Sequence, residues 1–154
     1  MNITIFLLII IFIIAFSSSY SSLNIDNLAY VLAIGIDKSD KNKLQVTFEF
    51  ASTAASESGS SEKTTPIINS VDASSISNAI NLINSYIVKG INMSHCKSII
   101  FSEELAYEGI SDEIYTLIND TQVRPSANII ISKCKAKDYI KYTILELENS
   151  KYKY

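Results

Sequence analysis

The residues best suited to chemistry in this chain are adjacent: His95, its sole histidine, and Cys96. A thiol nucleophile needs a histidine facing it and a third group that orients the histidine. The apolar residues 97–101 predict a strand, and neighbouring strand positions point to opposite faces, which suits this pair poorly. A zinc site needs three or four ligands, and one histidine with two distant cysteines does not supply them. The sequence therefore predicts no catalytic, cofactor-binding or metal-binding residues.

The two cysteines flank two predicted strands. Cys96 precedes the strand at 97–101, and Cys134 follows a second strand at 128–133. If these strands run parallel, the two sulfurs lie at opposite ends of a sheet. Five strand residues span roughly 16 Å, far beyond the ~7 Å between Cα atoms that a disulfide tolerates. Two free thiols are predicted, although an exported protein would permit a bridge.

Other polar patterns point to ordinary surface. The sequence from Asp37 to Asn42 (DKSDKN) resembles a calcium loop, but the sixth and twelfth positions are Asn42 and Phe48 where glycine and glutamate are required. A solvated hairpin loop is predicted there instead. No nucleotide-binding or hydrolase motif occurs, so no enzyme is predicted. The net charge is −3 without a basic cluster, which disfavours nucleic-acid binding.

The first half of the chain predicts an antiparallel arrangement. Residues 28–36 form an apolar run typical of a central strand covered on both faces. Residues 43–51 alternate apolar and polar side chains, so the two strands should form a hairpin. The Ser- and Thr-rich residues 52–65 predict a mobile loop. Pro66 then opens a predicted edge strand at 66–71.

The second half alternates strands with helices, which predicts parallel strands. Helices are expected at 74–88, 111–119 and 136–147. Asp72 or Ser74 is expected to cap the first helix and Gly90 to end it, and Ser111 is expected to cap the second. The apolar positions expected to face inward are Ile76, Ala79, Ile80, Ile83, Ile87, Ile114, Leu117, Ile118, Ile140, Ile144 and Leu147. The predicted fold is α+β, with a mixed sheet of about five strands and helices packed on it.

An uncharged apolar run precedes this domain. Residues 3–16 contain no Gly, Pro or charged residue, and serines follow directly. The length of about 14 residues suits the core of a signal peptide and falls short of the roughly 20 that a spanning helix needs. We expect residues 1–20 to be a signal peptide or membrane anchor, with an extracytoplasmic domain at 23–148 and a tail at 149–154. A buried core helix is the alternative.

Four segments also resemble one protein family, in its order along the chain. They are residues 24–37 followed by LQVTFEF, residues 74–80, residues 95–110 (HCKSIIFSEELAYEGI) and residues 124–137 (RPSANIIISKCKAK). Together they resemble the N-terminal domain of the GerAC-like proteins, the C-subunit lipoproteins of spore germinant receptors. The chain departs from that family in two respects. It has no cysteine directly after the apolar run, where the family carries an acylated one, and it is less than half the family's usual length.

The resemblance implies a non-enzymatic, lipoprotein-like subunit that acts in spore germination through protein–protein contacts. Its implied place is the outer face of the inner spore membrane, beside integral-membrane receptor subunits that detect nutrients. In this chain an uncleaved apolar segment would replace the lipid anchor. The alternative is a small exported ligand-binding module unrelated to sporulation.

Overall fold

The computed structural model describes residue 3 and residues 28–40, 43–51, 66–120 and 122–150, with side chains through Glu146. The expected signal peptide or anchor at 1–20, apart from residue 3, the expected loop at 52–65 and most of the expected tail lie outside this part of the chain, as does the side chain of Leu147. Within the described part, no helix combines the length and apolarity needed to cross a membrane.

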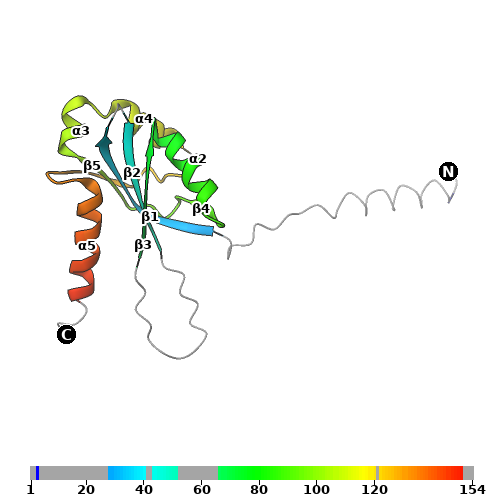
Figure 1. The fold of residues 1–154 in the computed structure, drawn as a ribbon. Coiled ribbons are helices and arrows are strands. Elements are labelled where there is room, and N and C mark those ends of the chain that lie inside the picture. The colour runs from blue at the N-terminus through cyan, green and yellow to red at the C-terminus, as the bar shows by residue number, and fades with distance from the viewer. Residues whose placement is uncertain (1–2, 4–27, 41–42, 52–65, 121, 151–154) are drawn as a thin grey trace.

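A mixed sheet is the centre of the fold (Figure 1). Its strands lie in the order β3-β2-β1-β5-β6, and the short β4 pairs with the start of β1. β1 pairs antiparallel with β2 and parallel with β5, and β6 pairs parallel with β5. The strands are β1 (Leu28–Ser39), β2 (Lys43–Phe50), β3 (Ile67–Ala73), β4 (Gly90–Asn92), β5 (Ser98–Ser102) and β6 (Asn128–Ser132).

Helices cover both faces of the sheet (Figure 1). α2 and α4 lie on one face, which we call the α2 face, and α5 lies on the other, the α5 face. α3 follows the end of β5. The helices are α2 (Ile76–Tyr86), α3 (Glu103–Glu108), α4 (Ser111–Asn119) and α5 (Ala136–Ser150).

The central strand β1 supplies side chains to both cores, as its continuous apolar sequence predicts. Ile34 and Ile36 are fully buried on the α2 face. Ala33 belongs to the smaller core on the α5 face. Gly35, on the same side of the strand as Ala33, lies directly beneath α5, where a Cβ atom would come 2.9 Å from Ile140 Cδ1. The absence of a side chain at Gly35 therefore lets α5 approach the sheet closely.

The predicted fold class, the central and edge strands, and the parallel second half are confirmed. The predicted edge strand after Pro66 is β3, which begins at Ile67. The inward positions Ile76, Ala79 and Ile83 of α2 are buried, and so are Ile140 and Ile144 of α5. Binary patterning was sufficient for these two helices because each buries one apolar stripe.

Several expected helix ends are wrong. The N-cap of α2 is Ser75, whose hydroxyl accepts the backbone N–H of Asn78. This helix ends at Tyr86 with Ile87 as its C-cap, and Gly90 instead opens β4. The N-cap of α4 is Ile110 rather than Ser111, which is the first helical residue.

Two further expectations about exposure and extent are corrected. Ile118 was expected to face inward, but it is 69% exposed, whereas the preceding Leu117 is the buried residue of this turn of α4. β1 continues through Asp37 and Lys38 to Ser39, so the first half of the expected hairpin loop is strand. Asp37 in particular is buried rather than solvated.

Candidate functional site

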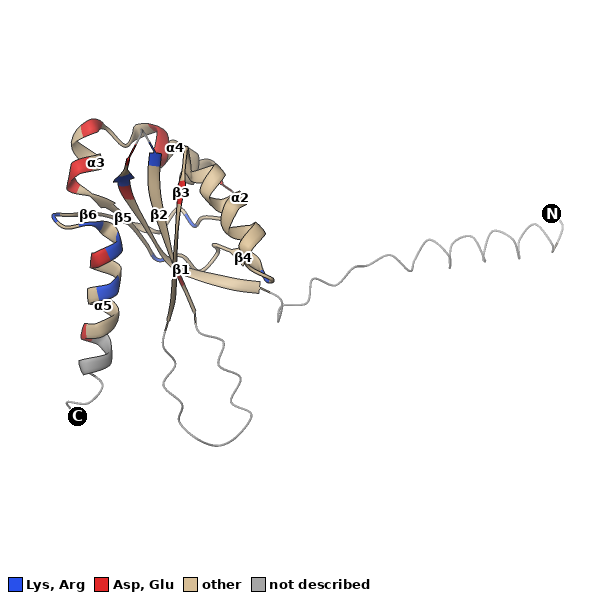
Figure 2. Cartoon of the chain, viewed as in Figure 1, with Lys and Arg blue, Asp and Glu red and all other residues tan. Residues whose placement is uncertain are grey.

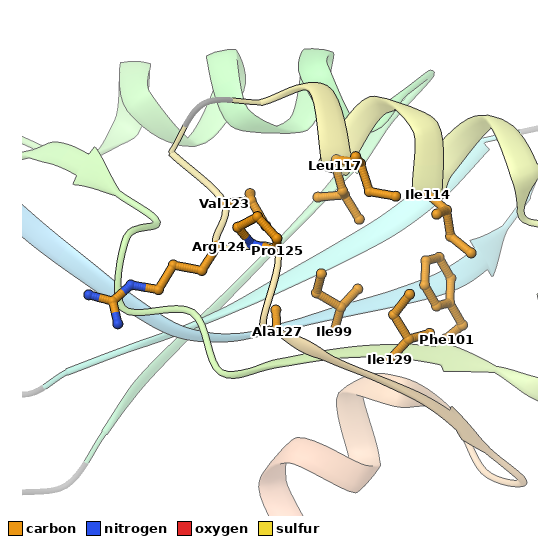
Figure 3. Close-up of a pocket in the computed structure, with 10 residues that line it drawn as sticks. Ile99, Phe101, Ile114, Leu117, Val123, Arg124, Pro125, Ala127 and Ile129 are labelled. Carbon is orange, nitrogen blue, oxygen red and sulfur yellow. The ribbon is translucent and has the colours of Figure 1, made fainter.

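An apolar cavity of about 90 Å³ lies between α4 and strands β5 and β6 (Figure 3). Ile99 and Phe101 of β5 form its floor, and Ile114 and Leu117 of α4 face them across it. The segment after α4 closes one end, and there the side chain of Arg124 extends away from the cavity (Figure 3). The full lining is Ile99, Phe101, Ile114, Leu117, Ile118, Val123, Arg124, Pro125, Ala127 and Ile129.

The cavity opens beside β6, the last strand on this side of the sheet. Ile129 and Ile131 of this strand project on the α2 face and are 49% and 58% exposed. No described strand pairs with the outer side of β6. We call this outer side, with the side chains of residues 128–132, the β6 edge. An uncovered strand of this kind offers both unpaired backbone groups and apolar surface.

A second groove, of about 290 Å³, lies on the α5 face of the same strand. It runs between α5 and the sheet, and Ile130 of β6 and Tyr139 of α5 line it together with Glu49 and Lys97. Partial burial raises the pKa of the Glu49 carboxyl above its ordinary value. The β6 edge is therefore flanked by an apolar opening on each face of the sheet.

Positive charge surrounds this edge. Lys97 lies at the start of β5, where its carbonyl accepts the backbone N–H of Asn128, and Arg124 precedes β6. Lys133 and Lys135 follow β6 directly, and all four side chains are exposed. In the part of the chain that the structure describes, the one salt bridge joins Lys38 to Glu108, elsewhere on the molecule. Figure 2 shows blue segments at the β6–α5 connection and at the start of α5.

Asp37, expected in a solvated loop, instead caps the last helix. Its two carboxylate oxygens accept the backbone N–H of Ala136, at 2.6 Å, and of Lys137, at 3.0 Å. A carboxylate at this place satisfies two otherwise unpaired donors and complements the positive end of the helix dipole. This role is structural, and it occupies the helix terminus that could otherwise receive an anion.

The structure does not bring His95 and Cys96 together as a catalytic pair. His95 is exposed in a turn, and its ring packs edge-on against Tyr30 with ring centroids 4.9 Å apart. Cys96 is buried, and its thiol donates to the carbonyl of Ser98 at 3.5 Å. Burial raises the pKa of the Cys96 thiol to about 11, with a smaller contribution from the negative charge of Glu49. A thiol held protonated in this way is a poor nucleophile.

The second cysteine lies at the far end of the sheet. Cys134 is exposed after β6, with its sulfur 3.2 Å from the hydroxyl oxygen of Ser132. Both cysteines are free, as the parallel strands predict. Among residues 28–40, 43–51, 66–120 and 122–150, no three His, Cys, Asp or Glu side chains cluster as a metal site would require.

The cavity and the β6 edge were not identified from the sequence. A signal was present: the strand sequence NIIIS contains three isoleucines without a charge or a proline. Interpreted by itself, such a run predicts a buried strand. Its exposure depends on its place at the end of the sheet order, which the local sequence does not specify.

Comparison with known proteins places the chain in a family. A family model described as the N-terminal domain of spore germination proteins matches residues 21–153. A relative described as a spore germination protein, YfkR of Bacillus subtilis (strain 168), is 26% identical over 129 residues. That alignment covers 80% of this chain and 33% of the relative, so the chain spans about a third of that curated protein's length. No solved structure matches the chain significantly.

The match extends over the whole described domain, from before β1 to the end of α5. It contains the four segments whose resemblance to GerAC-like proteins is described above. The chain belongs to the family of spore germination protein N-terminal domains.

Proposed function

We propose that this protein is a non-enzymatic subunit of a spore germinant receptor, held at a membrane and working through contacts with integral-membrane subunits. The observation that carries the proposal is the family match over residues 21–153, which assigns the chain to spore germination proteins. The apolar run at residues 3–16 supports attachment at the extracytoplasmic face of the inner spore membrane.

The surface of the domain is also suited to contact. An apolar cavity and an uncovered strand lie side by side at the β6 edge, and both would gain from burial by another polypeptide. His95 and Cys96, the residues most capable of chemistry, are used in packing. A role through surfaces accounts for this distribution of polar and apolar groups.

The proposal is tested in a sporulating strain with the gene deleted. Loss or slowing of germination in response to a nutrient, restored by the wild-type gene, is expected. The protein should fractionate with the inner spore membrane and co-purify with integral-membrane receptor subunits. Normal germination of the deletion strain with every nutrient tried, or recovery of the protein in the spore core, would overturn the receptor role.

The alternative is a small exported ligand-binding module, for which the apolar cavity is the candidate ligand site. Pockets for small molecules are usually about 300–1,000 Å³, whereas this cavity is about 90 Å³. The cavity is therefore too small for most nutrients. A rise in melting temperature with a small apolar compound, abolished by Leu117→Phe filling of the cavity, would favour this alternative.

A further inference from the structure

The two edges of the sheet are protected to different degrees. At one edge, β3 follows Pro66 and carries Asp72 with an exposed side chain. At the other, β6 has neither a charge nor a proline within residues 128–132. Proteins usually blunt an exposed edge strand with such residues, since its unpaired backbone groups can recruit another strand. The β6 edge lacks this protection.

The surroundings of β6 provide space for the side chains of an added strand. Successive side chains of a strand point to opposite faces of the sheet. Beside β6, those on the α2 face would meet Ile129, Ile131 and the mouth of the apolar cavity. Those on the α5 face would meet Ile130 and the groove beside Tyr139. A further strand would thus extend both layers of the core.

The positive charges near the two ends of β6 favour one kind of binding partner over others. Lys97 and Arg124 lie near its start, and Lys133 and Lys135 lie beyond its end. The single acid of residues 120–135 is Asp120, whose carboxylate accepts the backbone N–H of Gln122. Acidic residues flanking an incoming strand would therefore meet cations at both ends.

The same charges disfavour a second copy of this chain. Antiparallel pairing of two β6 strands about Ile130 would place residue 128 of one copy opposite residue 132 of the other. The start of β6, with Lys97 and Arg124, would then lie against Lys133 and Lys135 of the second copy. This juxtaposition of like charges costs free energy, whereas an acid-flanked segment gains it.

We propose that the β6 edge binds an extended, apolar polypeptide segment flanked by acidic residues, which adds a strand to the sheet. Main-chain hydrogen bonds to β6 would hold the segment, and the two apolar openings would select its side chains. The inference deepens the proposed function, on which it rests, by naming the contact surface of the receptor subunit and the chemistry of its partner.

The test uses the 154-residue chain in mild detergent and short synthetic peptides. The probe has alternating valine and threonine with two acidic residues at each end. One control peptide replaces the acids with lysines, and another is N-methylated along one edge so that it cannot pair. The acidic peptide is expected to bind at least tenfold more tightly than either control, measured by fluorescence anisotropy, and to weaken as salt is raised.

Two matched protein variants locate the site. Ile131→Asp places a negative charge on the β6 edge, and Ile67→Asp places one on β3, where the isoleucine is similarly exposed, at 55% against 58%. Ile131→Asp should weaken binding of the acidic peptide at least tenfold without changing the melting temperature, because the new charge repels the peptide and the apolar contact is lost. Ile67→Asp should leave binding unchanged.

Equal binding of the three peptides, equal loss in both variants, or a dimer of the free chain in sedimentation that the acidic peptide dissociates would each overturn the assignment of this edge to an acid-flanked partner. These outcomes do not depend on the germination phenotype of the deletion strain. That phenotype tests the receptor role separately.

Discussion

At the scale of single residues, Asp37 differs most from its local context. It lies in a polar run, DKSDKN, yet it is 2% exposed and binds two backbone N–H groups of α5. Its partners are 99 and 100 residues away in the chain. A carboxylate is an acceptor at both oxygens, and no other side chain of similar size supplies two acceptors with a negative charge.

Replacing Asp37 should therefore destabilise the domain. Asp37→Ala leaves two donors of α5 without an acceptor and should lower the free energy of unfolding by about 2–3 kcal/mol. Asp37→Asn keeps one acceptor and should cost about 1 kcal/mol. Urea denaturation followed by circular dichroism measures both. Asp138→Asn, an exposed change in the first turn of the same helix, is the control and should stay within about 0.5 kcal/mol.

The two thiols should differ in reactivity. Cys96 is buried with a pKa of about 11, whereas Cys134 is exposed. At pH 8 roughly one Cys96 in a thousand is thiolate, so a maleimide or iodoacetamide should label Cys134 quickly and Cys96 very slowly. Mass spectrometry of the native protein should show one label, and in urea, without reductant, it should show two. Equal labelling rates in the native protein would contradict the buried position of Cys96.

At the scale of elements, the close packing of α5 against the sheet depends on Gly35. A Cβ atom there would lie 2.9 Å from Ile140 Cδ1 and 3.2 Å from the backbone carbon of Ala136. Because the second contact is with backbone, relaxation would require α5 to move. Gly35→Ala should therefore lower stability by about 1–3 kcal/mol.

Gly90→Ala is the matched control, since the nearest atom to a Cβ at that position is Leu28 Cδ2 at an ordinary 3.6 Å. Its free energy of unfolding should change by no more than about 0.5 kcal/mol. Thermal unfolding of the two variants side by side makes the comparison. Equal stability of the two variants would mean that the packing of α5 on the sheet does not depend on the missing side chain at Gly35.

The elements that the sequence predicted are those with enough residues to show a period. α4 was expected at 111–119 and occupies Ser111–Asn119, and β1, β2 and β3 were located within a few residues. β4 has three residues and was missed, because so short a strand exists only through pairing with β1. α3, which was not among the expected helices, has six residues. Propensity alone seldom specifies a helix of that length.

The candidate site was less predictable than the fold. The interpretation of His95 and Cys96 rested on their adjacency in the sequence, and in the structure the two side chains make separate contacts. The apolar cavity depends on how α4 lies over β5, and the β6 edge depends on sheet order. Both features depend on contacts between segments that are distant in the sequence. The pattern of a single segment therefore predicts neither of them.

At the scale of the whole molecule, the described residues form two cores, one on each face of the sheet. These two cores are built from residues between Ala29 and Ile144. We expect deletion of residues 1–20 to leave the melting temperature unchanged within a few degrees and to release the protein from the membrane fraction. Differential scanning calorimetry and sedimentation of membranes measure the two effects. Unfolding of the deleted form would assign the apolar run to the core instead.

The bond between Asp37 and the first turn of α5 also has a consequence for the nascent chain. Its acceptor is synthesised 99 residues before its nearer donor, and at ~5–20 residues per second this interval is roughly 5–20 s. During that time the α5 face of β1 has no cover and β6 has not been made. Because this contact joins residues that are 99 positions apart, we expect folding of the domain to follow the synthesis of α5 rather than to accompany the synthesis of β1 to β3.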